Sequence, residues 1–93
     1  MNIDLFNDNV LVEELQDDLL INGVVLRYDS DSPYMFCEVI SSSQNAKENK
    51  VNPGDILVIK RYAKEEYLPG QYFISYKDIR GSILKADYES IKV

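Results

Sequence analysis

The sequence predicts an all-β fold, a small barrel of five or six short strands. Apolar residues at helical spacing are not sustained over any window of about 11 residues. Short runs of β-branched and aromatic residues, bounded by turn residues, recur instead along the whole chain. With 93 residues and 10.7 kDa, the chain is expected to form one domain, residues 1–93, with a small core. We expect a domain of this size to gain stability from assembly.

The first two predicted strands enclose the longest connection of the chain. Residues 9–15 place Leu11 between Val10 and Val12, which is typical of a strand that is covered on both faces. The second predicted strand comprises residues 36–41.

Two Pro-Gly pairs predict turns in the second half of the chain, because proline presets φ and glycine supplies a positive φ. Pro53-Gly54 precedes a predicted strand at residues 56–59, and Pro69-Gly70 precedes another at residues 71–76. The tail from 82–84 to 91–93 offers one or two more extended pieces.

The connection at residues 16–34 is long for so small a domain, and long connections are usually functional or disordered. Asn22-Gly23 stands in it between the apolar triplets 19–21 and 24–26, which is the strongest short-range signal for a type I′ hairpin. Two interpretations remain open from the sequence alone. The segment is either an ordinary core hairpin or an exposed apolar loop kept for docking.

The charge balance disfavours nucleic acid as a partner. Against 16 Asp and Glu the chain has 10 Lys and Arg, a formal charge of −6, whereas non-specific nucleic-acid affinity depends on Lys and Arg. No apolar run approaches the roughly 18 residues that span a bilayer, and the acidic start Met1-Asn2-Ile3-Asp4 lacks the positive charge of a signal peptide. We therefore expect a cytoplasmic protein that binds neither nucleic acid nor a membrane.

Metal binding and acid-base catalysis find little support in the composition. Histidine is absent and Cys37 is the only cysteine, which removes the commonest zinc ligand, the commonest general base and any internal disulfide. Asp29 and Asp31 lack the closing glutamate of a calcium loop, since Ile40 stands in its place. We expect solvated loop charge there and at Asp17-Asp18.

Three further groups of residues have ordinary structural interpretations. Ser41-Ser42-Ser43 lacks the strand-turn-helix elbow and Gly-rich loop of a serine nucleophile. Seven tyrosines and three phenylalanines without a basic groove predict core and interface packing rather than a stacking platform for single strands. Cys37 beside Phe36 predicts a small buried hydrophobe rather than a reactive thiol. We expect a non-enzymatic protein without a cofactor.

Five motifs in order resemble those of the GroES-type co-chaperonins, over about residues 1–84. Met1-Asn2-Ile3 with Asp8-Asn9-Val10-Leu11-Val12 is similar to the N-terminal strand of the family with its Asp-Arg-Val motif. Asn22-Gly23-Val24-Val25-Leu26 resembles the Gly-Gly-Ile-Val-Leu of the mobile loop, and Glu38-Val39 the Gly-Glu-Val that begins the next strand. Val51-Asn52-Pro53-Gly54-Asp55-Ile56-Leu57-Val58 is similar to Val-Lys-Val-Gly-Asp-x-Val, and Tyr76-Lys77-Asp78-Ile79 to Glu-Ser-Asp-Ile.

The resemblance implies a heptameric ring of GroES-like β-barrels that caps a GroEL-type chaperonin and closes its folding chamber. Residues 16–34 correspond to the mobile loop after the first strand, and residues 43–50 to a shortened roof segment in place of a roof hairpin. As a compact and divergent sequence, the chain resembles in particular the co-chaperonins that bacteriophages encode. The chaperonin-binding residues that it implies are Ile21, Asn22, Gly23, Val24, Val25 and Leu26.

A second hypothesis comes from another class of protein. The chain could form a small β-barrel that serves as a structural or adaptor module, for instance a virion component, without a chaperonin partner. In that case residues 19–26 are expected in the core, whereas a docking loop is expected to expose them.

Overall fold

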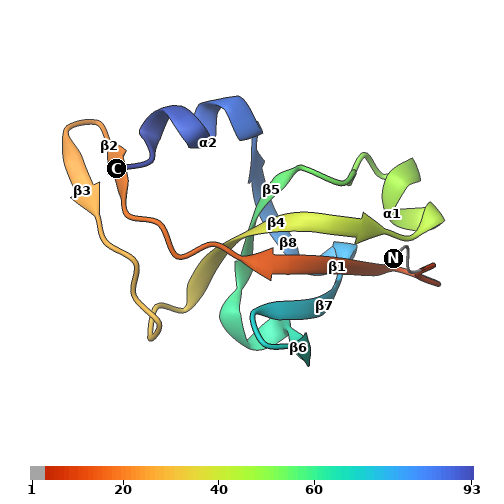
Figure 1. Cartoon of the computed structure of the whole chain (residues 1–93). Coiled ribbons are helices and arrows are strands. Elements are labelled where there is room, and N and C mark those ends of the chain that lie inside the picture. The colour runs from red at the N-terminus through yellow and green to blue at the C-terminus, as the bar shows by residue number, and fades with distance from the viewer. Residues whose placement is uncertain (1–3) are drawn as a thin grey trace.

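The computed structural model of the protein describes residues 4–93; the motif at residues 1–3 lies outside them. The domain is mostly β, as the sequence predicts. Six strands form one antiparallel sheet in the order β6-β7-β1-β4-β5-β8, and two more form a separate hairpin, β2-β3. The molecule measures 40 × 25 × 25 Å, and Figure 1 shows the hairpin with the C-terminal helix at one end and the start of β1 at the other. The elements are β1 (Asn9–Glu14), β2 (Leu19–Ile21), β3 (Val24–Leu26), β4 (Tyr34–Ser42), α1 (Gln44–Glu48), β5 (Ile56–Lys60), η1 (Arg61–Ala63), β6 (Glu65–Leu68), β7 (Gln71–Ser75), η2 (Tyr76–Asp78), β8 (Ile79–Ile83) and α2 (Lys85–Ile91).

Strand β1 lies inside the sheet, between β7 and β4. Its residues Val10, Leu11 and Val12 are all buried, because an internal strand that is covered on both faces can place consecutive apolar side chains inside. This confirms the first predicted strand, which ends at Glu14 in the structure.

Strand β4 is longer than predicted and carries the alternation of a half-buried strand. Met35, Cys37 and Val39 are buried, whereas the residues between them are more exposed. Its register with β1 shifts between Leu11 and Val12, the signature of a β-bulge, which increases the local twist. Figure 1 shows β5 and β8 running steeply across the direction of β1 and β4, so the sheet is strongly twisted.

The predicted Pro-Gly turns are both present. Gly54 and Gly70 have φ values of 93° and 79°, a region that glycine adopts without steric cost. The Asp55 side chain accepts a hydrogen bond of 2.8 Å from the backbone N–H of Asn52 and closes the first turn.

The core is divided into two apolar clusters. The larger lies on the sheet and includes Val12, Cys37 and Leu57. The smaller joins three separate elements, because Leu19 of the hairpin packs with Ile56 of β5 and Tyr88 of α2. The hairpin is therefore held to the sheet by packing against the C-terminal helix, in addition to its covalent connections to β1 and β4.

The interval expected to hold a shortened roof segment, residues 43–50, contains helix α1. Ser43 caps this helix, since its Oγ accepts a hydrogen bond of 3.2 Å from the N–H of Ala46. Ala46 is fully buried in the larger cluster. The last of the three consecutive serines is thus a helix cap.

The tail contains two extended pieces, as predicted: β8 and Lys92, which forms an isolated antiparallel bridge with Leu19. The helix between them, α2 at Lys85–Ile91, was not predicted. Helical periodicity is recognised over windows of about 11 residues or more, and this helix has only two turns. The spacing of Tyr88 and Ile91 therefore does not predict a helix. These two side chains, three positions apart, lie on one face of the helix and pack with the smaller cluster.

Strand β6 was not predicted. All its residues are exposed and two of them, Glu65 and Glu66, disfavour strands. Pairing with β7 determines its conformation, with Glu65 opposite Phe73 and Glu66 opposite Tyr72, so tertiary context overrides local propensity.

Core and hairpin leucines should respond differently to truncation. Leu57 is 2% exposed and Leu20 is 48% exposed. We expect Leu57→Ala to lower the free energy of unfolding by about 2–5 kcal/mol because it leaves a cavity, and Leu20→Ala to change it by less than about 1 kcal/mol. Urea denaturation measures both, and a similar loss for the two variants would contradict the burial described above.

Candidate functional site

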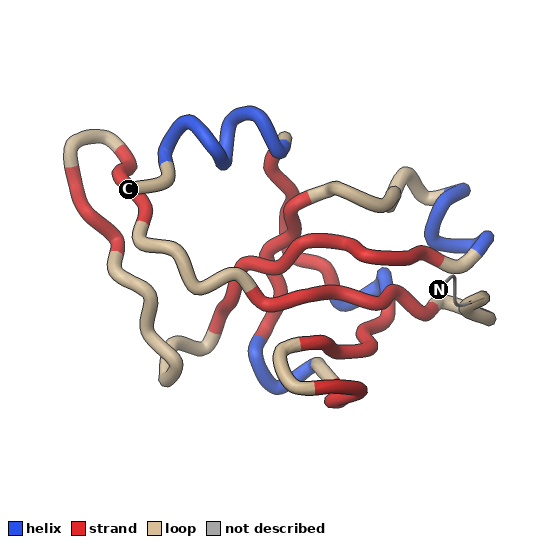
Figure 2. The backbone as a smooth tube through the Cα atoms, viewed as in Figure 1, coloured by secondary structure: helices blue, strands red, loops and turns tan. Residues whose placement is uncertain are grey.

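The β2-β3 hairpin forms a two-stranded unit of its own beside the twisted sheet (Figure 2). Leu20 pairs with Val25 across it. Asn22 and Gly23 have φ values of 52° and 80°, the positive values that a type I′ turn requires at both central positions. The hairpin predicted from Asn-Gly is therefore present, and position 23 needs glycine for its backbone conformation.

The apolar side chains of the hairpin face solvent, with one exception. Leu19 is 1% exposed, whereas the other five are between 37% and 66% exposed. A core hairpin would bury them all, so the structure fits that interpretation only at Leu19. The structure brings the six residues implied by the resemblance together on this exposed hairpin: Ile21, Asn22, Gly23, Val24, Val25 and Leu26.

Both faces of the hairpin are apolar. Because side chains alternate along a strand, the cross-strand pair Leu20 and Val25 lies on one face, and the pair Ile21 and Val24 lies on the other. The arrangement offers an apolar surface without a charged group of its own. Such a surface suits insertion into an apolar groove.

Arg61 fastens the returning leg of the connection, residues 27–34, to the sheet. Its Nε donates to the carbonyl oxygen of Ser32 at 2.8 Å and its Nη2 to that of Asp29 at 3.1 Å. Its Nη1 donates to Oε2 of Glu14 at 2.6 Å. The rigid five-donor fork of one arginine thus ties a loop without regular structure to the end of β1.

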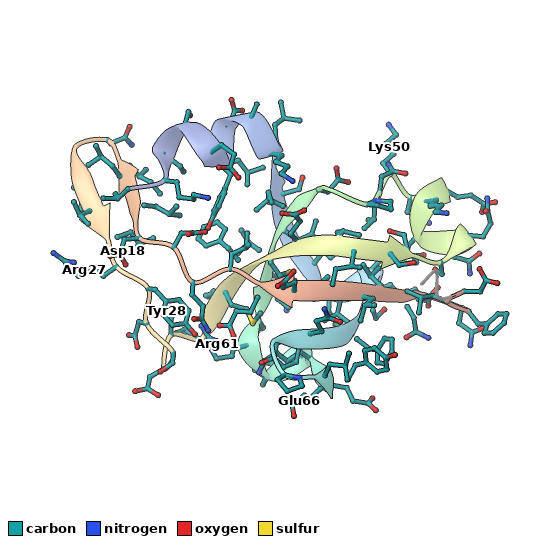
Figure 3. All side chains as sticks on the ribbon, in the orientation of Figure 1. Asp18, Arg27, Tyr28, Lys50, Arg61 and Glu66 are labelled. Atoms are coloured by element: carbon teal, nitrogen blue, oxygen red, sulfur yellow. The ribbon has the colours of Figure 1, made fainter. Side chains whose placement is uncertain are left out.

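Glu14 receives two hydrogen bonds at the base of the hairpin, from Arg61 and from the hydroxyl of Tyr28 at 2.7 Å. Burial raises the pKa of Glu14, but these hydrogen bonds and the charge of Arg61 outweigh burial, so the pKa lies below its ordinary value. The Glu14 hydrogen bond and burial raise the pKa of Tyr28. Figure 3 shows Tyr28 and Arg61 side by side between the hairpin and the sheet.

Asp18 joins the two legs of the hairpin. Its Oδ1 accepts a hydrogen bond of 2.7 Å from the backbone N–H of Tyr28, and its Oδ2 lies 3.6 Å from Nη1 of Arg27. Figure 3 shows Asp18 and Arg27 next to each other at the base of the hairpin. The ion pair contributes little because Arg27 is well exposed, so the backbone hydrogen bond is the stronger tie.

Asp17 and Asp18 are only partly solvated, in contrast to the loop charge predicted there. Both carboxylates accept specific hydrogen bonds, Asp17 from the hydroxyl of Tyr88 at 2.9 Å. No motif in the sequence predicts the pair of Glu14 and Arg61. These two residues are 47 positions apart, and no local pattern records a contact of that separation.

The space at the base of the hairpin is small. A cavity of about 70 Å³ lies between the hairpin base and the sheet, lined among others by Leu15, Leu26 and Phe36. Within residues 4–93, no three His, Cys, Asp or Glu side chains lie close enough together to hold a metal ion.

Cys37 has the environment of a buried hydrophobe. It is fully buried in the larger cluster, and burial, with a smaller effect from the charge of Glu14, raises the pKa of its thiol to about 12. A thiol in this state is not nucleophilic near neutral pH.

No protein-family model matches the chain, and no curated protein is similar to it at a significant level. Across the described part of the chain, none of the helices has the length and apolar character to cross a bilayer.

Removing the charge of Glu14 should destabilise the protein in a pH-dependent way. Because the folded state lowers its pKa, the stabilisation is present above the ordinary glutamate pKa and is lost as the pH falls through the lowered value. We expect Glu14→Gln to lower the free energy of unfolding by about 1–3 kcal/mol near neutral pH, with a smaller difference below about pH 4.

The matched control is Glu13→Gln, since Glu13 is exposed on the same strand. Urea denaturation between about pH 7 and pH 3 measures both variants. An equal loss for the two variants, or a Glu14→Gln difference that is constant over this range, would contradict the described network.

Proposed function

We propose that this protein is a non-enzymatic co-chaperonin, which assembles as a heptameric ring and caps a GroEL-type chaperonin through the β2-β3 hairpin. The observation that carries the proposal is the hairpin itself, an apolar surface that extends from an anchored base at the end of the domain. The ordered motifs that resemble those of GroES-type co-chaperonins give the partner class. The proposal places the protein in the cytoplasm and assigns it no cofactor.

The proposed docking residues are Ile21, Asn22, Gly23, Val24, Val25 and Leu26. A turn conformation that is set by Asn22-Gly23 presents apolar side chains on both faces. An apolar groove between helices of the partner would accept such a hairpin, since it can bury both faces at once. Solvent exposure of these side chains in the free domain is otherwise unfavourable, which supports a role in binding.

Docking of one hairpin is expected to be weak. Fully burying Val24, Val25 or Leu26 contributes about 1.5–3 kcal/mol each relative to full exposure. Each is roughly half exposed in the free protein, so docking recovers roughly half of that. Association and side-chain ordering oppose this gain. A ring overcomes the deficit because, once one hairpin is bound, the remaining hairpins bind intramolecularly.

In the proposed ring, the sheet and helix α1 would form the body and the roof of the dome. The twisted sheet would take the place of the β-barrel of the proposed family. Within residues 4–93, its edge strands β6 and β8 each have a strand partner on one side only. Helix α1 occupies the interval of the roof hairpin, so the proposed dome has a shortened roof. Such a compact form agrees with the proposed likeness to co-chaperonins of bacteriophages.

Replacing Val25 with Asp should abolish docking. A carboxylate in the apolar groove would lose its hydration without gaining a partner. We expect Val25→Asp to lose co-migration with a GroEL-type chaperonin in the presence of nucleotide, and to lose its activity in chaperonin-assisted refolding, while the ring stays intact. Light scattering on size exclusion and a refolding assay measure these effects.

Leu84→Asp provides the matched control. Leu84 is 72% exposed and is the N-cap of α2, without a side-chain hydrogen bond to the helix. Aspartate suits that position, so the same chemical change should leave capping intact. Unchanged refolding activity in Val25→Asp would refute the assignment of the hairpin as the docking element.

The hypothesis of a structural or adaptor module without a chaperonin partner remains the alternative. It expected residues 19–26 in the core, and only Leu19 is buried there. A wild-type protein that does not bind the chaperonin, yet forms a stable domain, would favour this alternative.

A further inference from the structure

The segment that leads into the hairpin, residues 17–19, packs against the C-terminal helix α2. We call this segment the outgoing leg. The buried side chains of Leu19 and Tyr88 belong to the same small cluster as Ile56 of β5. The hydroxyl of Tyr88 donates to Oδ2 of Asp17 at 2.9 Å, two residues before β2 begins. The ring of Tyr88 also meets that of Phe36 on β4, with centroids 5.9 Å apart. One helical side chain therefore contacts both the hairpin leg and the sheet.

The last residues of the chain continue this contact through the backbone. The N–H of Val93 donates to the carbonyl oxygen of Asp18 at 3.0 Å. Lys92 forms an isolated antiparallel bridge with Leu19. Figures 1 and 2 both show the C-terminus beside β2. The segment after α2 thus lies along the outer side of β2, opposite to the side that pairs with β3.

A hairpin of two three-residue strands needs such support. Two-stranded hairpins are at best marginally stable in water, and β2 and β3 pair with each other rather than with the main sheet. The Arg61 network holds the returning leg, residues 27–34, whereas α2 holds the outgoing leg. Each leg therefore has a separate anchor.

We propose that α2 and residues 92–93 form a C-terminal clasp, which positions the hairpin for docking. The clasp holds β2 in its paired conformation and occupies the outer edge of β2 through Lys92 and Val93. A partner then meets a preformed hairpin through its exposed side chains and through the edge of β3 that pairs with no other strand among residues 4–93. The docking half of this inference rests on the proposed function; the positioning half concerns the free protein alone.

Tyr88 is the central positioning residue of the clasp. Its contacts combine apolar packing on Leu19 with the hydrogen bond to Asp17. Tyr88→Phe removes only the hydrogen bond, Tyr88→Ala removes both, and truncation after Leu84 removes the whole clasp. Ser90→Ala is the matched control, because Ser90 is exposed on the same helix and its Oγ donates to the Asp87 carbonyl within that helix.

Amide hydrogen exchange on the free protein tests the positioning half. We expect truncation and Tyr88→Ala to accelerate exchange of the hairpin amides, residues 19–26, by at least about tenfold relative to wild type. Tyr88→Phe should give a smaller increase in the same residues. The amides of β1 and β4 should change much less, and Ser90→Ala should change neither region.

Two results would overturn the positioning role. Hairpin amides that stay as protected in the truncated protein as in wild type would show that the hairpin is ordered without the clasp. Equal acceleration in the hairpin and in β1 and β4, in Tyr88→Ala and Tyr88→Phe alike, would show that α2 only stabilises the domain as a whole.

Chaperonin binding tests the docking half. With a GroEL-type chaperonin plus nucleotide as the probe, Tyr88→Ala should bind at least about tenfold more weakly than wild type, because the hairpin must then be ordered during binding. Unchanged affinity in this variant, alongside loss of binding in Val25→Asp, would overturn the clasp while leaving the proposed function intact. Absence of wild-type binding would overturn the docking half together with the proposed function, and the amide exchange would still decide the positioning half.

Discussion

Two paired strands of three residues bury too little apolar surface to be stable alone in water, and the organisation of this end of the molecule follows from that constraint. Each leg of the hairpin is held by a residue from a distant part of the chain. Arg61 binds the carbonyl groups of the returning leg, and Tyr88 packs on the outgoing leg. Without these anchors, six apolar residues would sit on a mobile loop; with them, one is buried and the rest are presented in a defined geometry.

The anchors and the exposed apolar surface are spatially separated. Charges and polar contacts, such as the Glu14 carboxylate between Arg61 and Tyr28, lie at the base of the hairpin. The turn and the apolar pairs lie beyond them, so a partner can bury the apolar surface without desolvating the ion pair. In the proposed function this separation lets each hairpin bind weakly and reversibly while the domain keeps its fold, and the ring supplies the affinity that one hairpin lacks.

The sequence predicted the features that depend on neighbouring residues. The run Val10-Leu11-Val12, the two Pro-Gly turns and the Asn-Gly hairpin are all local patterns, and the structure contains each of them. The features that were missed depend on distant partners: β6 needs β7, and the Arg61 anchor needs a carboxylate 47 positions away. Helix α2 was missed because it is too short to show a period, although its buried Tyr88 determines where the hairpin lies. The motif alone was enough to name the six site residues. Whether their side chains are exposed could be seen only in the structure, because exposure depends on how the hairpin packs against the rest of the chain.

Light scattering on size exclusion is the decisive test of whether the protein forms a ring that docks on a chaperonin through its hairpin. The purified protein is measured alone and mixed with a GroEL-type chaperonin, with and without nucleotide. For a co-chaperonin ring we expect a mass near that of a heptamer, which co-migrates with the chaperonin only when nucleotide is present. A monomer or dimer that does not co-migrate under either condition would contradict it.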